Sequence, residues 1–279
     1  LQMKFDKMYT TKDIYTIYNW MLDDCGCDLL PEVPYEKRKL PYEDVFPMLY
    51  LKYRLSGGNS THKNIKHLVI DEMQDYTYLQ YTILESLFHC RMTILGDRAQ
   101  TLDTKQQDVL RFLPKLLGRE IRTIEIKKSY RNTLEIARYA EKVSGVSDLE
   151  LLDRHGKEVV EKTFNTDTEL LDELVCHLKC PGDFETAALI TTTEEEAFDL
   201  SRLLKLRGIN VSYVDRNSSA FKKGLTVTTF YLAKGLEFDQ VFALRGAKEN
   251  PLKNQAEYIC ATRALHELYV YKIADSLSK

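Results

Sequence analysis

The feature that most constrains the fold is the alternation of short β-rich apolar runs with longer stretches of helical periodicity after residue 65. Alternation of this kind is typical of parallel sheets, because two parallel strands need a crossover connection that is usually a helix. The sequence therefore predicts an α/β fold with parallel sheets flanked by helices, rather than a helical bundle or an all-β fold.

The expected elements follow from these runs. The predicted strands are His67–Asp71, Met92–Asp97, Arg122–Ile126, Thr186–Thr191, Asn210–Val214, Leu225–Phe230, Gln240–Leu244 and Leu268–Ile273. The predicted helices are Lys12–Leu22, Tyr42–Leu55, Tyr78–Phe88, Gln106–Leu117, Thr133–Val143, Asp167–Leu178, Glu194–Leu206 and Asn254–Leu265. Gly208 suits the stop of the helix that ends near Arg207. A boundary is expected near residues 118–120, where a second sheet begins at Arg122.

Length and composition limit the class of protein. The chain has 279 residues, a formal net charge of −3 and 44% hydrophobic residues, which suits about two domains. Any nucleic-acid site must therefore be a local patch. No apolar run is long enough to span a bilayer, and the six scattered cysteines indicate reduced thiols in a cytoplasmic protein. Leu1 stands where a methionine is expected, which indicates a piece of a longer protein.

An acidic pair follows the first predicted strand. The apolar run Leu68–Ile70 ends in Asp71 and Glu72. In α/β folds, phosphates and metals bind beyond the carboxyl ends of the strands. Asp71 could hold Mg²⁺ through oxygen, and Glu72 could activate an attacking water. The alternative is that the pair only ends a strand or caps the next helix.

A second strand, Met92–Leu95, runs into Gly96 and continues to Gln100. Glycine lets the backbone turn close to a ligand, and the Gln100 amide could sense a terminal phosphate. The alternative is an ordinary exit from a strand into a turn.

Two arginines lie in short polar segments. Arg131 is in the run Lys127–Asn132, before a predicted helix, and Arg263 lies in Ala261–Ala264. A planar guanidinium suits a transferring phosphoryl group, whose charge it can stabilise. Each arginine could equally be a solvated surface residue.

The last candidate segment is Val227–Phe238, a β-rich run with a sharp turn at Lys234 and Gly235. The Thr229 hydroxyl could bind a nucleic-acid phosphate, and Glu237 could bind a ribose hydroxyl. The alternative is a strand, a tight turn and a second strand with Glu237 exposed.

Taken in order, these segments closely resemble motifs II to VI of the UvrD/Rep-like superfamily 1 helicases. The matching segments are Val69–Asp75, Leu95–Gln100, Ser129–Arg131, Thr229–Phe238 and Tyr258–Ala264, within about residues 65–273. The strings Ala-Lys-Gly-Leu-Glu-Phe and Thr-Arg-Ala are specific. Within the family the chain resembles the HelD type (helicase IV-like, the RNA polymerase-associated branch), through Asp71–Tyr76 and Leu40–Asp44.

The resemblance implies a role for each matched residue. Asp71 would coordinate Mg²⁺, and Glu72 would activate the hydrolytic water. Gln100 would couple the γ-phosphate to the nucleic-acid site, and Arg131 and Arg263 would contact the γ-phosphate. Glu237 and Gly235 would hold the nucleotide, and Thr229 and Tyr231 would contact nucleic acid. The implied cofactors are ATP and Mg²⁺. The implied partners are nucleic acid, with DNA preferred, and RNA polymerase.

The resemblance also implies a domain plan. Residues 1–64 would be a helical lead-in from the first lobe or its insertion. Residues 65–120 would be the C-terminal part of the first RecA-like lobe, and residues 121–279 the complete second lobe. Because the lobes carry different catalytic groups, ATP turnover would depend on their closure.

Several features depart from the family pattern. No Gly-x-x-x-x-Gly-Lys-Ser/Thr loop is present, and Gly57–Thr61 is no substitute, so the chain alone is predicted to lack ATPase activity. Asp97–Asp103 lacks the usual further acids and terminal aromatic, and Tyr231 stands where a histidine is usual. The interval between Arg131 and Thr229 has no large accessory subdomain.

Two rival functions remain. The first is a non-catalytic protein-interaction module on a RecA-like scaffold, which the missing phosphate loop and weak net charge favour. The second is a nuclease-fused relative, but no Asp/Glu–Lys nuclease cluster follows Arg263.

Overall fold

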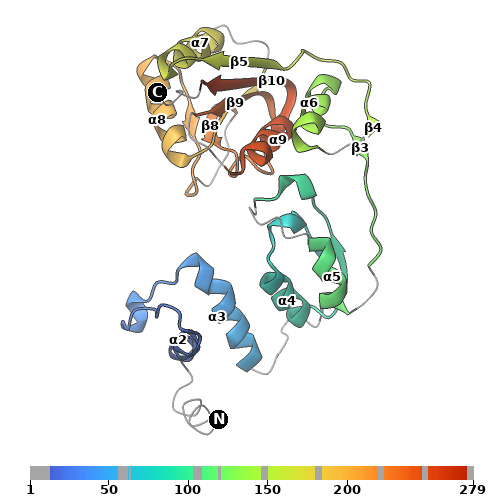
Figure 1. Cartoon of the computed structure of the whole chain (residues 1–279), viewed down its shortest axis with the longest axis vertical. Coiled ribbons are helices and arrows are strands. Elements are labelled where there is room, and N and C mark those ends of the chain that lie inside the picture. The colour runs from blue at the N-terminus through green and yellow to red at the C-terminus, as the bar shows by residue number, and fades with distance from the viewer. Residues whose placement is uncertain are drawn as a thin grey trace. The chain divides into compact units, whose positions relative to one another are not determined.

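The computed structural model describes residues 13–55, 62, 64–102, 109–118, 121–145, 150–179, 184–218, 223–246 and 251–274 (Figure 1). The chain forms two compact units. Unit 1 consists of the described residues of Leu1–Asp97 and Gln107–Arg122, and unit 2 of those in Arg98–Gln106 and Thr123–Lys279. The division of the chain into 1–64, 65–120 and 121–279 stays a prediction.

The described part of unit 1 begins with two helices, α2 (Ile14–Cys25) and α3 (Tyr42–Leu55), with a 3-10 turn at Tyr35–Lys37 between them. The Asp13 carboxylate accepts a bond from the Tyr15 amide at the start of α2, and Gly26 ends the helix in the left-handed conformation, with φ 67°. A small core of their own holds the helices together, made of Tyr15, Tyr18, Leu22, Leu30 and Met48.

The rest of unit 1 is a small α/β layer. Strand β1 (His67–Ile70) pairs in parallel with β2 (Arg91–Ile94), and helices α4 (Tyr78–Leu87) and α5 (Val109–Leu117) pack on the pair. A capping box of Thr77 and Gln80 begins α4. The predicted strand–helix–strand order is confirmed here. The loop Gly57–Thr61 and the start of the predicted helix at Gln106 lie outside the described residues.

Unit 2 is built on a six-stranded sheet in the order β5-β10-β9-β6-β8-β7, in which neighbouring strands pair in parallel. The strands are β5 (Val160–Phe164), β6 (Thr186–Thr191), β7 (Ser212–Tyr213), β8 (Gly224–Thr229), β9 (Phe238–Arg245) and β10 (Ala264–Ile273). The helices are α6 (Leu134–Ser144), α7 (Asp167–Lys179), α8 (Glu194–Leu206) and α9 (Lys253–Arg263). The predicted α/β class, with parallel strands flanked by helices, is confirmed.

The central strands of this sheet are apolar on both faces. Ala188, Ile190 and Val241 face a core shared with α6 and α9, while Leu189 and Phe242 face a core shared with α7 and α8. Figure 1 shows the two helix pairs on opposite sides of the sheet. A parallel sheet is covered on both faces in this way, so its inner strands read as continuous apolar runs.

The chain crosses the sheet between β8 and β9. Strand β6 lies between these two parallel strands, so residues 230–237 return from the carboxyl end of β8 to the amino end of β9. Phe230 and Ala233 bury their side chains in the core on the way, with 5% and 0% exposed. This crossing carries Glu237 to the residue directly before β9.

Some sequence predictions were wrong. Residues 122–126 form no strand, and Ile124 and Ile126 are 71% and 79% exposed. An alternating pattern predicts a strand only if a neighbour buries one face, and here the pairing is limited to β3 (Lys128–Ser129) with β4 (Glu150–Leu151).

Two further differences concern the larger sheet. Strand β5 was missed because its central residues are polar and exposed, as at a sheet edge. The helix predicted to end at Leu265 ends at Arg263, because β10 begins at Ala264. Gly208, with φ 78°, follows the end of α8 as predicted.

Cys25, Cys27, Cys90, Cys176 and Cys260 are free thiols. In the part of the chain that the structure describes, no helix combines the length and apolar character needed to cross a bilayer.

The two-faced core predicts a large cost for truncating its central aromatic ring. Phe242 is fully buried and stacks on Tyr269 with ring centroids 4.7 Å apart. We expect Phe242→Ala to lower the free energy of unfolding by about 3–5 kcal/mol, measured by urea denaturation. Phe198→Ala, which removes a ring that is 55% exposed, is the control and should change stability by less than about 0.5 kcal/mol. Equal losses for the two variants would contradict the assignment of this core.

Candidate functional site

The nine predicted site residues divide between the two units. Asp71 and Glu72 belong to unit 1, and the other seven belong to unit 2.

The acidic pair lies directly after β1, where the strand delivers it. Asp71 is exposed, and its Oδ1 accepts a bond from the Glu72 amide at 2.8 Å. Glu72 has φ 53° and ψ 48°, the one left-handed conformation recorded for a non-glycine residue in the described part of the chain. Such a conformation costs free energy and persists only where the surroundings hold it, which is common at functional sites.

Gln74 is a residue that the sequence predictions missed, and it holds Glu72 in place. It is 8% exposed, its Nε2 donates to Glu72 Oε2 at 2.6 Å, and its Oε1 accepts from the Asp97 amide at 3.0 Å. One amide thus ties the turn after β1 to the turn after β2. The signal in the sequence was only a glutamine two residues after the glutamate.

Gly96 leaves the room that Met73 and Gln74 need where the turns after β1 and β2 meet. A Cβ at Gly96 would lie 2.4 Å from Met73 Cγ and 2.5 Å from Gln74 Oε1, both too close for any side chain. The glycine therefore permits the close approach of Met73 and Gln74, and its predicted role beside a ligand stays a prediction.

The carboxylate of Asp71 fits Mg²⁺, because an exposed oxygen ligand at a strand end leaves room for water and phosphate oxygens, which usually complete the shell of this ion. Within the described ranges, no three His, Cys, Asp or Glu side chains form a metal-binding group.

In unit 2, Gln100 and Arg263 meet. Gln100 ends a 3-10 turn (Arg98–Gln100) and Arg263 ends α9, and both are buried, at 7% and 3% exposed. Arg263 Nη2 donates to Gln100 Oε1 at 3.2 Å, and Nη1 donates to the carbonyl of Leu236 at 3.3 Å. Lys234 Nζ donates to the Gln100 carbonyl at 3.2 Å. The segments Leu95–Gln100, Thr229–Phe238 and Tyr258–Ala264, which resemble motifs III, V and VI, therefore meet around the Arg263 guanidinium.

The other arginine is more open. Arg131 Nε lies 2.7 Å from Glu237 Oε1, and the two side chains are 49% and 43% exposed. Gly235, with φ 80°, makes the turn that leads into Glu237. A pair this exposed contributes about 1 kcal/mol or less, so either partner could exchange it for a ligand.

Asn132 is a second residue that the predictions missed. It is 9% exposed, and its Nδ2 donates to the carbonyls of Ala261 and Ala264, at 3.3 Å and 2.5 Å. Since Arg131 precedes Asn132 and Arg263 lies between the two acceptors, this amide fixes the two arginine segments relative to each other.

The two residues predicted to contact nucleic acid differ in access. Thr229 is 1% exposed, and its hydroxyl has no hydrogen-bond partner among the described residues. Tyr231 is partly exposed, and its hydroxyl donates to Glu194 Oε1 at 2.9 Å. Arg216 also pairs with Glu194, at 2.6 Å, and its guanidinium lies 5.8 Å from the centroid of the Tyr231 ring.

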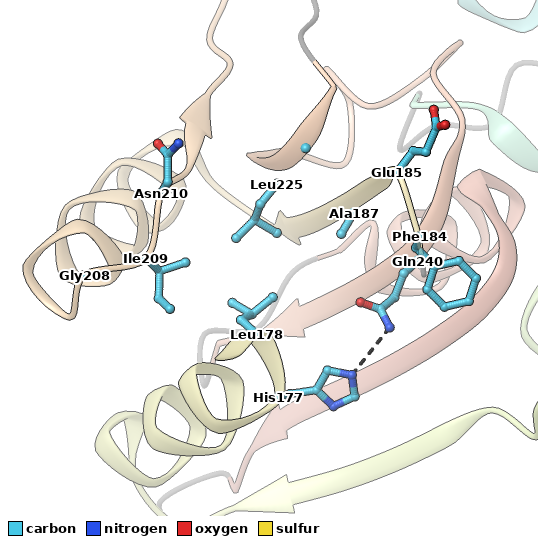
Figure 2. Close-up of a pocket in the computed structure, with 11 residues that line it drawn as sticks. His177, Leu178, Phe184, Glu185, Ala187, Gly208, Ile209, Asn210, Leu225 and Gln240 are labelled. Carbon is cyan, nitrogen blue, oxygen red and sulfur yellow. Dashed lines mark hydrogen bonds between the residues drawn. The ribbon is translucent and has the colours of Figure 1, made fainter. Parts of the chain in front are cut away.

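A cavity of about 360 Å³ lies elsewhere in unit 2, at the amino ends of β6 and β8 (Figure 2). Its lining includes Phe184, Leu225, His177 and Gln240, and the last two approach to 3.4 Å through their Nε2 atoms. Burial lowers the pKa of His177. None of the nine predicted residues lines this cavity, so it is not the site that the motifs predict.

At the level of sequence, no known protein family and no curated protein matches the chain. Among solved structures, it is similar to the C-terminal domain of a possible DNA helicase from Lactobacillus plantarum, with 25% identity and a TM-score of 0.42, over 52% of this chain and 88% of that one. It is also similar to the PRRSV helicase, with 16% identity and a TM-score of 0.43, over 94% and 46% of the two chains.

A third similar structure is arterivirus nonstructural protein 10, a helicase solved with DNA, with 17% identity and a TM-score of 0.32, over 43% of this chain and 29% of that one. The chain thus spans less than half the length of either viral helicase. All three TM-scores lie below 0.5, so these similarities by themselves assign no function to the chain.

The junction at Asn132 predicts a measurable loss of stability. Asn132→Ala leaves the carbonyls of Ala261 and Ala264 without this donor, which should lower the free energy of unfolding by about 1–3 kcal/mol in urea denaturation. The control is Asn165→Ala at an exposed position, which should change it by less than about 0.5 kcal/mol. An Asn132→Ala variant as stable as the control would show that the two segments are held by other contacts.

Proposed function

We propose that the chain is part of a superfamily 1 helicase-like protein that binds ATP with Mg²⁺ and acts on nucleic acid. The observation that supports this most is the contact of Gln100 with Arg263, 163 residues apart, beside the pair of Arg131 and Glu237. These are the residues that the motif resemblance assigns to the nucleotide. Gln100 and Arg263 come together although the chain between them contains five of the six strands of the larger sheet.

The proposed roles follow from the access of each side chain. Arg131 is half-exposed and can turn its planar fork from Glu237 to a γ-phosphate, which frees Glu237 for the ribose. Gln100 and Arg263 are buried together, so a phosphate that draws Arg263 would also move the Gln100 amide. On unit 1, Asp71 would hold Mg²⁺ and Glu72 would orient the water.

In this proposal units 1 and 2 carry parts of two RecA-like lobes. Mg²⁺ would supply charge that stabilises the phosphates, while the protein would hold the acids on one lobe and the arginines on the other. Nucleotide turnover would then depend on closure of the lobes, which converts hydrolysis into movement along nucleic acid or remodelling of a bound complex.

The finer assignments rest on fewer residues. The HelD type, with RNA polymerase as a partner, is supported by the segments Asp71–Tyr76 and Leu40–Asp44. A cytoplasmic location is proposed from the scattered cysteines, read as reduced thiols. DNA contact is assigned to Thr229 and Tyr231. The Tyr231 ring is partly exposed, whereas Thr229 is 1% exposed and would bind a phosphate only after its surroundings move.

A non-catalytic interaction module is the second candidate, and one observation favours it. The guanidinium of Arg263 is 3% exposed and donates to Gln100, Leu236 and Thr262 within the protein. A scaffold would retain such an arginine for packing alone. The two functions differ in one measurable property. The helicase-like protein should bind nucleotide through Arg131, and the interaction module should not.

The nucleotide role predicts weak, γ-phosphate-dependent binding by the 279-residue chain. In ³¹P NMR titrations, MgATP should bind more tightly than MgADP, and Arg131→Ala should weaken MgATP binding by about tenfold, the value of one charge-assisted contact. Arg207→Ala is the matched control, since Arg207 pairs with Asp172 on the surface and has no proposed role. If MgATP and MgADP bind alike and Arg131→Ala has no effect, the interaction module is the better description.

The missing phosphate loop predicts that binding is not followed by turnover. The 279-residue chain should release no phosphate above background from ATP with Mg²⁺, because its sequence has no Gly-x-x-x-x-Gly-Lys-Ser/Thr motif, whose backbone would cradle the β- and γ-phosphates. A coupled phosphate-release assay with Glu72→Gln as the reference checks this. Hydrolysis that depends on both Mg²⁺ and Glu72 would show that another segment supplies the cradle.

A further inference from the structure

The loop Asp153–Lys157 packs on the turn that carries Arg131, although about 22 residues separate them in the sequence. Its approach begins with β4, which pairs in parallel with β3, placing Leu151 beside Ser129. Gly156 lies so close to Thr133 that a Cβ there would be 2.5 Å from Thr133 Cγ2. The middle of the loop therefore contacts the arginine turn and the start of α6.

The loop also supplies the missing cap of α6. Thr133 occupies the N-cap position, yet its side chain makes no capping bond, and its buried hydroxyl has no partner among the described residues. The Leu134 amide instead donates to the carbonyl of Arg154 at 2.8 Å. The start of α6, and with it the turn from Arg131, is thus tied to the loop.

Arg154 holds the arginine turn most directly. Its Nη1 donates to the carbonyl of Arg131 at 3.2 Å, and its Nη2 lies 3.1 Å from Nδ1 of His266 on β10. A planar guanidinium presents several donors in fixed directions, so one side chain can bridge the turn and the sheet.

A charged pair fastens the loop to α6. Glu135 Oε1 lies 2.8 Å from Nδ1 of His155, and its Oε2 accepts from the Gly156 amide at 2.8 Å. The bond from His155 lowers the pKa of Glu135 to about 2, and Glu135 raises the pKa of His155. The pair is therefore charged from low pH up to the raised pKa of His155, and Asp153 faces the other ring nitrogen at 3.0 Å.

We propose that Arg154 is a positioning residue for nucleotide binding: it holds the backbone of Arg131, through its carbonyl, at the place from which the Arg131 side chain meets the γ-phosphate. The inference rests on the proposed function. Arg154 itself need not touch the nucleotide, because its two donors are directed at Arg131 and His266.

A double-mutant cycle in the 279-residue chain, with MgATP affinity measured by ³¹P NMR, tests this role. Arg154→Ala should weaken binding by about threefold to tenfold, part of the effect of Arg131→Ala. Adding Arg154→Ala to Arg131→Ala should change affinity by less than about twofold, because nothing is left to position. MgADP, which lacks the γ-phosphate, should bind the Arg154→Ala variant as it binds the unchanged chain.

The conservative variant and the control complete the cycle. Arg154→Lys keeps one donor for the Arg131 carbonyl and should retain more affinity than Arg154→Ala, whereas Arg207→Ala should bind normally. Circular dichroism checks that each variant is folded. If Arg154→Ala is not folded, Arg154→Lys replaces it in the double-mutant cycle. Independent, additive losses from the two arginines, or equal losses of MgATP and MgADP affinity, would overturn the positioning role.

The outcome for Arg131 separates the two proposals. If Arg131→Ala weakens MgATP binding and the Arg154 variants do not, the positioning role is overturned while the proposed function stands. If Arg131→Ala has no effect, the proposed function fails and the positioning role fails with it.

Discussion

Burial of the six-stranded sheet on both faces is the constraint on which unit 2 depends. A parallel sheet has two apolar sides, and each side must find a cover. Helices α7 and α8 cover one side, and α6, α9 and the crossing segment 230–237 cover the other. Since α7, α8, α9 and the crossing segment also connect strands of this sheet, the residues at their ends have little freedom in where they lie.

The candidate site is a consequence of that arrangement. Glu237 ends the crossing segment and Arg263 ends α9, so both lie directly before strands, at the amino ends of the adjacent strands β9 and β10. The acids of unit 1 follow the more usual rule, because Asp71 and Glu72 lie beyond the carboxyl end of β1. The acids of unit 1 therefore follow a strand, whereas Glu237 and Arg263 precede one.

The turn that carries Arg131 shows how a half-exposed side chain can still be held. Asn132 anchors the turn from the inside by bonds to Ala261 and Ala264, and Arg154 anchors it from the outside through the Arg131 carbonyl. The backbone is fixed on both sides while the guanidinium keeps a weak, exchangeable partner in Glu237. A held backbone with an exchangeable guanidinium suits a side chain that must bind a ligand.

The sequence by itself determined the parallel α/β class, most element positions and the order of the motif segments, because strand and helix periodicity and turn glycines such as Gly208 act locally. It misplaced a strand at residues 122–126 and missed β5, since pairing depends on neighbours distant in sequence. Only the tertiary structure decided which predicted residues meet: Gln100 with Arg263, and Arg131 with Glu237. It alone revealed Gln74, Asn132 and Arg154, because their importance lies in hydrogen bonds to turns and backbone groups that only the folded chain brings within reach.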